Sequence, residues 1–153
     1  MSKARPEMLA KLRELNRLSE ESGLDPFLLE LLKIRCSQLN HCAYCIDMHT
    51  KDARAMGETE QRIYALSAWR ETPFFTDTER AALALAEAVT VLTDGFVPDE
   101  VYRAAAEVLD EAELSAVVWA AVVINAFNRI AVTGRAEPGA YVSHRRPLDR
   151  ATA

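Results

Sequence analysis

Apolar residues recur along most of the chain at the three- and four-residue spacing of amphipathic helices, and no segment alternates as a strand would. Proline, glycine and capping residues interrupt this pattern where helices should begin and end. The pattern therefore predicts an all-α bundle of about seven helices. We expect them at about residues 6–21, 26–39, 40 or 41 to 57, 59–70, 76–94, from 98 onward, and 110–134.

The last of these helices is the most apolar, and from Leu114 to Ile130 it is apolar on nearly every side. Such a helix must be covered by neighbours, and six shorter helices can barely surround it. We therefore expect a homo-oligomer, a trimer or a hexamer; a monomer built around a buried central helix is the alternative. Beyond Gly134 the periodicity fades, and residues 135–153 are expected to form a tail, with Arg145 and Arg146 either clasping a neighbouring subunit or disordered.

Composition narrows the possible functions. The 153 residues suit a single domain, 1–153, with its core at about 24–134. Half of them are hydrophobic and 27% are charged, which excludes general disorder, and the net charge of −5 argues against nucleic acid as a partner. No signal peptide is recognisable, and the longest apolar stretch, 116–124, is too short for a membrane span. Three cysteines form no disulfide framework, so we expect a cytoplasmic protein.

The candidate chemistry lies in the segment His41-Cys42-Ala43-Tyr44-Cys45-Ile46-Asp47-Met48-His49. At about 100° per residue, Cys42, Cys45 and His49 fall on one face of a helix. Both cysteines lie near the predicted helix start, where free amides and the helix dipole lower the pKa of a thiol. The spacing therefore predicts two sulfurs and an imidazole close together.

Three interpretations of this segment remain open from the residues alone. It can be a reactive dithiol, or the cysteines can be small buried hydrophobic residues. It can also be a zinc site, for which the fourth ligand would have to be Cys36 or His41, neither at a standard spacing.

The segment resembles the alkylhydroperoxidase D (AhpD-like) branch of the carboxymuconolactone decarboxylase superfamily. The motif of that branch is a glutamate, eleven residues, then cysteine-x-x-cysteine-x-x-x-histidine, which Glu30, Cys42, Cys45 and His49 match in every gap. The resemblance covers about residues 24–134. One departure is visible: the prototype peroxidases carry a histidine just before the second cysteine, where this chain has Tyr44.

The resemblance implies a thiol-dependent peroxidase or disulfide oxidoreductase with an AhpD-like fold and no metal or organic cofactor. It makes Cys45 the attacking thiol, Cys42 the resolving thiol and His49 a proton donor held by Glu30. The implied partners are a hydroperoxide and a thiol reductant, in this family sometimes a lipoyl-bearing protein. The alternatives are a lactone enzyme of the decarboxylase type, whose branch lacks the cysteine pair, and a non-catalytic metal-binding or assembly protein.

The remaining candidates rest on weaker patterns. Helical periodicity puts Glu30 on the solvated face of its helix, so only the resemblance brings it to the site. Tyr44 points away from the thiol face, and Asp52 either orients His49 or forms an exposed pair with it. The other expectations are a helix-capping His41, a packed Cys36, and core or interface positions for Trp69 and Trp119.

Overall fold

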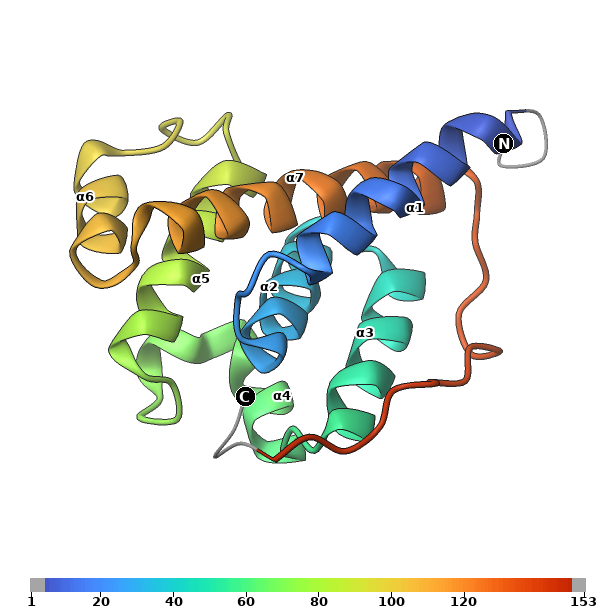
Figure 1. The fold of residues 1–153 in the computed structure, drawn as a ribbon, viewed down its shortest axis with the longest axis horizontal. Coiled ribbons are helices and arrows are strands. Elements are labelled where there is room, and N and C mark those ends of the chain that lie inside the picture. Colours follow the sequence, from blue (N-terminus) through green and yellow to red (C-terminus); the bar gives the residue numbers. More distant parts are fainter. Residues whose placement is uncertain (1–4, 150–153) are drawn as a thin grey trace.

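The computed structural model describes residues 5–149, and all of the regular secondary structure in that range is helical (Figure 1). The elements are α1 (Pro6–Glu20), α2 (Pro26–Leu39), α3 (Ala43–Met56), α4 (Glu60–Ala65), a short 3-10 helix η1 (Leu66–Glu71), α5 (Asp77–Thr90), α6 (Asp99–Val108) and α7 (Glu111–Thr133). The expected all-α fold with seven α-helices is confirmed.

Helix starts follow the capping signals in the sequence. The Asp25 carboxylate accepts a hydrogen bond from the backbone N–H of Phe27 at 3.0 Å, ahead of the proline that opens α2. Thr76 and Asp110 each form a complete capping box, at the starts of α5 and α7. At the end of α3, Gly57 has φ of 112°, a left-handed conformation that glycine adopts without strain.

Two helix boundaries differ from expectation. Helix α3 begins at Ala43, later than predicted, because His41 has a positive φ of 53° and turns the chain, which leaves Cys42 as the capping residue. Helix α5 ends at Thr90, short of Gly95. The Thr90 hydroxyl donates to the carbonyl of Ala86 at 2.7 Å, and the chain then turns through a segment that includes Phe96 with φ of 61°.

The core forms where α2 is surrounded by α3, α5, α7 and η1 (Figure 1). Most residues of α2 are buried, including the charged Glu30 and Lys33. Helix α7 crosses the top of this core and also contacts α1. This arrangement places α3, which carries Cys45, against α2, whose buried residues include the acid Glu30 and the base Lys33.

By length and composition alone, α7 is the one helix among the described residues that would suffice to cross a membrane; its most apolar 18-residue window has a mean hydropathy of 1.6 and is 44% buried. In this fold its buried face packs on α2 and α5. Trp119, Val122 and Val132 remain on its exposed side, with Trp119 51% exposed. This apolar surface supports the expectation of an oligomer, which stays a prediction.

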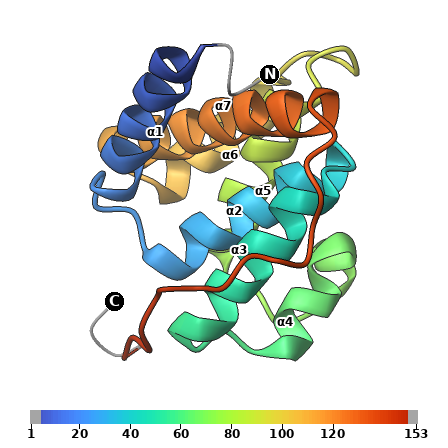
Figure 2. The same ribbon diagram turned by 90° about the vertical axis from the view of Figure 1, so that its right-hand side faces the viewer.

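The segment after α7 is irregular, as expected, but it packs on this chain itself. Residues 135–149 run down from the end of α7 and cross the outside of α3 (Figure 2). The Lys51 ammonium donates to the carbonyls of Gly139 and Tyr141 at 3.1 and 3.0 Å, and the backbone N–H of Leu148 donates to Met56 at 2.8 Å. Disorder, one of the two expected alternatives, is therefore wrong for residues 135–149, and a contact of Arg145 or Arg146 with a neighbouring subunit stays a prediction. Residues 150–153 of the predicted tail lie outside the described range.

Candidate active site: a thiol pair beside a buried acid–histidine pair

Two thiols face each other at the start of α3. The sulfurs of Cys42 and Cys45 are 2.9 Å apart, and each residue is only 1% exposed. Cys42, at the capping position, donates to Cys45 in the first turn of the helix. A disulfide bond measures about 2.05 Å, so a shift of roughly 1 Å would join the two sulfurs.

The surroundings of Cys45 disfavour its thiolate. Burial and the neighbouring Cys42 thiol raise the pKa of Cys45 to about 12, and hydrogen bonds from Asn128 and Ser37 lower it only in part. This is opposite to the lowering that a position at a helix start suggests, because loss of hydration outweighs the helix dipole here. Removing the proton from Cys45 therefore requires a base close by.

A histidine and a glutamate are joined beside the thiols. The Nδ1 atom of His49 lies 2.7 Å from a carboxylate oxygen of Glu30, and both residues are buried. The periodicity argument for an exposed Glu30 was wrong, since the polar face of α2 packs under α3 and α1 rather than facing solvent. With Nδ1 held by the carboxylate, Nε2 is the nitrogen left for chemistry; it makes no hydrogen bond to any residue the structure describes.

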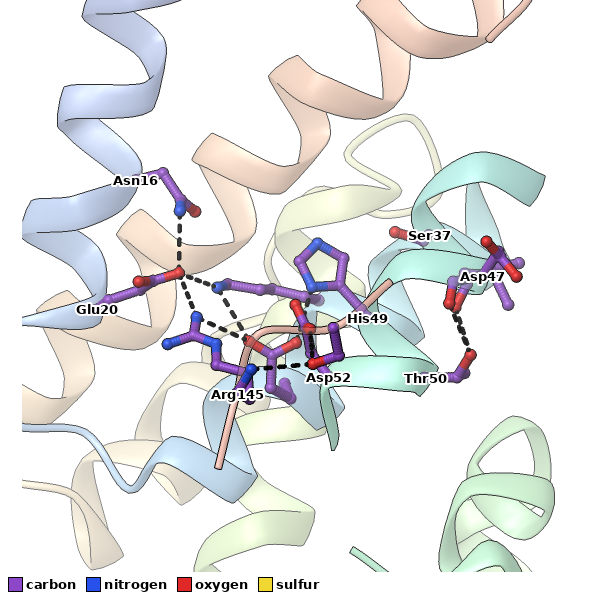
Figure 3. A network of polar contacts seen from close by, with 12 residues as sticks. Asn16, Glu20, Ser37, Asp47, His49, Thr50, Asp52 and Arg145 are labelled. Carbon is purple, nitrogen blue, oxygen red and sulfur yellow. Dashed lines mark hydrogen bonds and ion pairs between the residues drawn. The ribbon is translucent and has the colours of Figure 1, made fainter. Parts of the chain in front are cut away.

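Glu30 belongs to a larger charged cluster, in which Figure 3 labels Glu20, His49 and Arg145. The Lys33 ammonium lies 3.3 Å from Glu30 and 3.2 Å from Glu20, and Arg145 lies 2.7 Å from Glu20 and 3.8 Å from Glu30. Burial alone would raise the pKa of Glu30, but its interactions with His49, Lys33 and Arg145 lower it to about 2. The glutamate is therefore a permanent anion that can orient His49.

Asp52 lies close to this cluster without bonding to His49. Its carboxylate accepts hydrogen bonds from Tyr141 at 2.9 and 3.1 Å and from Ser143 at 2.5 Å. Of its two expected roles, the exposed pair is wrong, because Asp52 is buried under the tail. The tail segment thus closes the side of α3 that carries the acid–histidine pair.

Glu30, His49 and Asp52 form the one group of potential metal ligands found among residues 5–149, with their ligand atoms within 4.8 Å of one another. Neither cysteine of the pair is in that group, so the geometry does not favour a cysteine–histidine zinc site. The cluster contains three carboxylates, those of Glu20, Glu30 and Asp52, and two cations, Lys33 and Arg145. The two cations offset most of the acidic charge of this group.

A pocket of about 460 Å³ opens between α1, α3 and α7. Cys45 and His49 lie at its base, and no hydrogen bond joins these two residues to each other. Its other lining residues are Leu9, Arg13, Asn16, Tyr44, Met48, Phe127, Ile130, Ala131, Gly134 and Ala136. A molecule in this pocket would touch Cys45 and His49, whereas Cys42 is behind them and does not line it.

The other predicted residues fall as follows. Tyr44 lines the same pocket as Cys45 and His49, although helical periodicity put it away from the thiol face. His41 is exposed and makes no cap, since Cys42 takes that position. Cys36 and Trp69 are buried as expected, and Trp119 is the exposed one of the two tryptophans.

Sequence reasoning missed several residues that complete the site: Ser37, Lys33, Glu20, Asn128, Tyr141 and Ser143. A signal existed for two of them. Lys33 is a charged residue inside an apolar helix, and Asn128 is an amide inside the most apolar helix of the chain. Buried polar groups of this kind need partners, which is a reason to look for a site around them.

These observations define a class: an all-α protein with a buried dithiol and a glutamate-held histidine. Comparison with known proteins agrees. The model of the carboxymuconolactone decarboxylase family matches residues 6–88. The uncharacterized protein YdfG of Bacillus subtilis is 45% identical over 127 residues, which cover 83% of this chain and 86% of YdfG. The chain therefore belongs to the carboxymuconolactone decarboxylase family, in its AhpD-like branch.

Solved structures agree with this assignment. A protein from Agrobacterium tumefaciens, described as of unknown function and provisionally as the antioxidant defence protein AhpD, has a TM-score of 0.88 and 36% identity; the match covers 92% of this chain and 96% of that one. An uncharacterized peroxidase-related protein from Ralstonia eutropha shares the fold, with a TM-score of 0.79 at 17% identity over 91% of this chain and 74% of that one.

Proposed function

We propose that this protein is a thiol peroxidase that reduces organic hydroperoxides through Cys45 and Cys42. One observation carries the proposal: two free thiols lie 2.9 Å apart, and one of them, Cys45, lines a pocket together with His49. Membership of the AhpD-like branch supports it, as does the match in fold to a protein described in connection with antioxidant defence.

The proposed reaction has three steps. Cys45 attacks one peroxide oxygen, the O–O bond breaks, and the products are a Cys45 sulfenic acid and an alcohol, whose oxygen receives the proton that the thiol lost. The Cys42 thiol then condenses with the sulfenic acid, which releases water and forms a Cys42–Cys45 disulfide. A dithiol reductant reopens this disulfide by thiol exchange and is itself oxidised to a disulfide.

The first step requires a proton relay. Because burial and the neighbouring Cys42 raise the pKa of Cys45, its thiol is largely protonated at neutral pH. Nε2 of His49 is suited to take the proton as the S–O bond forms and to deliver it to the departing alkoxide. Glu30 holds the ring by Nδ1 and stabilises the transient imidazolium. General acid–base help of this kind contributes about 10²–10⁴-fold.

The structure supplies no reductant, and the proposal requires one by class only: a small dithiol, such as a lipoyl group, that can enter the pocket. Asn128 and Ser37 would assist the exchange, because their hydrogen bonds stabilise negative charge on the Cys45 sulfur. Assembly into a homo-oligomer and action in the cytoplasm are part of the same proposal.

The test is mass spectrometry of the reduced protein before and after one equivalent of tert-butyl hydroperoxide. We expect two thiols to disappear per chain, a Cys42–Cys45 disulfide in the digest, and Cys36 still free for alkylation. A Cys42→Ser variant should stop at the Cys45 sulfenic acid, which dimedone traps.

The matched control is Cys36→Ser, which should give the same disulfide as the unaltered protein. An unreacted Cys45 in the presence of excess hydroperoxide would contradict the proposal. Turnover of a lactone by a variant lacking both Cys42 and Cys45 would instead assign the protein to the decarboxylase type of chemistry.

A further inference from the structure

The pocket above Cys45 combines an apolar wall with one cation. Its wall includes Leu9 from α1, Met48 from α3, and Phe127 and Ile130 from α7. The one charged side chain among its lining residues, apart from the titratable His49 and Cys45, is Arg13 of α1. Ligand sites of about 300–1,000 Å³ with mostly apolar walls and a few placed polar groups are typical of small-molecule pockets.

Arg13 differs from the other cations of its helix. Lys11 forms an ion pair with Glu14 at 2.8 Å, and Arg17 forms one with Glu21 at 2.6 Å. Within the described part of the chain, Arg13 has neither an ion pair nor a hydrogen bond. Its guanidinium is therefore free to bind an anion at the pocket.

Asn16 does not compete for this role. Its amide, one turn further along α1, donates to Glu20 at 3.0 Å and is thereby tied to the charged cluster. Arg13 is thus the cation at this pocket whose donors are unused, and a planar guanidinium matches a carboxylate in two parallel hydrogen bonds.

Resting on the proposed function, we infer that the preferred substrates are aliphatic hydroperoxides that also carry a carboxylate, bound with the chain along the apolar wall, the carboxylate at Arg13 and the peroxide at Cys45. A pocket of 460 Å³ has room for about fifteen heavy atoms at the roughly 30 Å³ of a water molecule. A chain of about eight carbons with its carboxylate fits within this volume.

Binding of non-reactive analogues tests this inference separately from catalysis. Octanoate and 1-octanol, which share the alkyl chain and differ in charge, are titrated into the reduced protein and followed by ligand-observed NMR. We expect Arg13→Gln to weaken octanoate binding about three- to tenfold and to change octanol binding by less than about twofold. The matched control is Arg17→Gln, which removes a paired cation of the same helix and should leave both affinities unchanged.

Ala131→Trp, which fills the pocket, should abolish binding of both ligands and so locate the site. Equal binding of octanoate by Arg13→Gln and the unaltered protein overturns the inference, as does octanoate binding that survives in Ala131→Trp, or no octanoate binding at all.

Kinetics separate the two proposals. If neutral and anionic hydroperoxides oxidise Cys45 at equal rates, and Arg13→Gln changes neither rate, the proposed function stands and this inference is wrong. If octanoate binds through Arg13 but no hydroperoxide produces a Cys42–Cys45 disulfide, the anion-binding role of Arg13 stands and the proposed function is wrong.

Discussion

Cys36 and Cys45 are buried thiols in different parts of the molecule, and by two common criteria they look alike. Their exposed fractions are 0% and 1%. Burial raises the pKa of Cys36 to about 11, and burial together with Cys42 raises that of Cys45 to about 12. Neither exposure nor acidity would single out Cys45 as a reactive residue.

Their neighbours differ. Cys36 is enclosed between α2 and α5, where its sulfur accepts a hydrogen bond from Thr90 at 3.2 Å and lies 3.9 Å from the carbonyl of Ala86. Cys45 has a second sulfur at 2.9 Å, a pocket, and a histidine on the same pocket. The comparison teaches that partners and access, rather than the resting pKa, distinguish a thiol suited to reaction from one that only packs.

The largest effect is expected when the thiols of Cys45 and Cys36 are removed in turn. Cys45→Ser should abolish steady-state peroxide reduction with a dithiol as reductant, because no sulfenic acid can form. Cys36→Ser should retain the rate within about twofold, since serine preserves a small polar group next to Thr90. Comparable losses in both variants would mean that Cys36 takes part in the chemistry.

Replacing His49 tests whether the histidine at the pocket accounts for the reactivity of Cys45. His49→Asn should lower the rate of Cys45 oxidation by about 10²–10⁴-fold, because the proton has no other acceptor at this pocket. The exposed His41→Asn serves as control and should react as the unaltered protein does. Stopped-flow measurement of disulfide formation gives the rate; an unchanged rate in His49→Asn would remove the relay from the mechanism.

Glu30 and Glu79 allow a matched comparison of two buried carboxylates. Glu79 pairs with Arg62 and caps α5, far along the chain from the thiols. Glu30→Gln should slow Cys45 oxidation about 10- to 100-fold and alter its pH profile, because the histidine loses its orienting anion. Glu79→Gln should lower the free energy of unfolding by about 1–3 kcal/mol and leave the rate constant nearly unchanged.

The smallest expected effect is on stability at low pH. The folded-state pKa of Glu30, about 2, lies below its ordinary 4.5, so its ionisation stabilises the fold above pH 4.5. This contribution, about 3 kcal/mol, should be lost as the pH falls from about 4.5 to about 2. Urea titrations across that range should show a weaker pH dependence in Glu30→Gln; equal slopes would contradict the pKa.

The local signals of the sequence predicted the elements well, since capping boxes, prolines and Gly57 act within one helical turn. They failed where the cause was distant. The early end of α5 and the late start of α3 were missed because the turns at Thr90 and His41 have no strong breaker residue.

By itself, then, the sequence determined the helical class and placed Cys42, Cys45 and His49 together, because their spacing acts within a single helix. Only the tertiary structure decided the rest: that Glu30 is buried with Lys33, that Asp52 lies under the tail, and that Arg13 faces the pocket. Each of these depends on which helix packs against which, and contacts between residues far apart in the chain are not recorded in the periodicity of either segment.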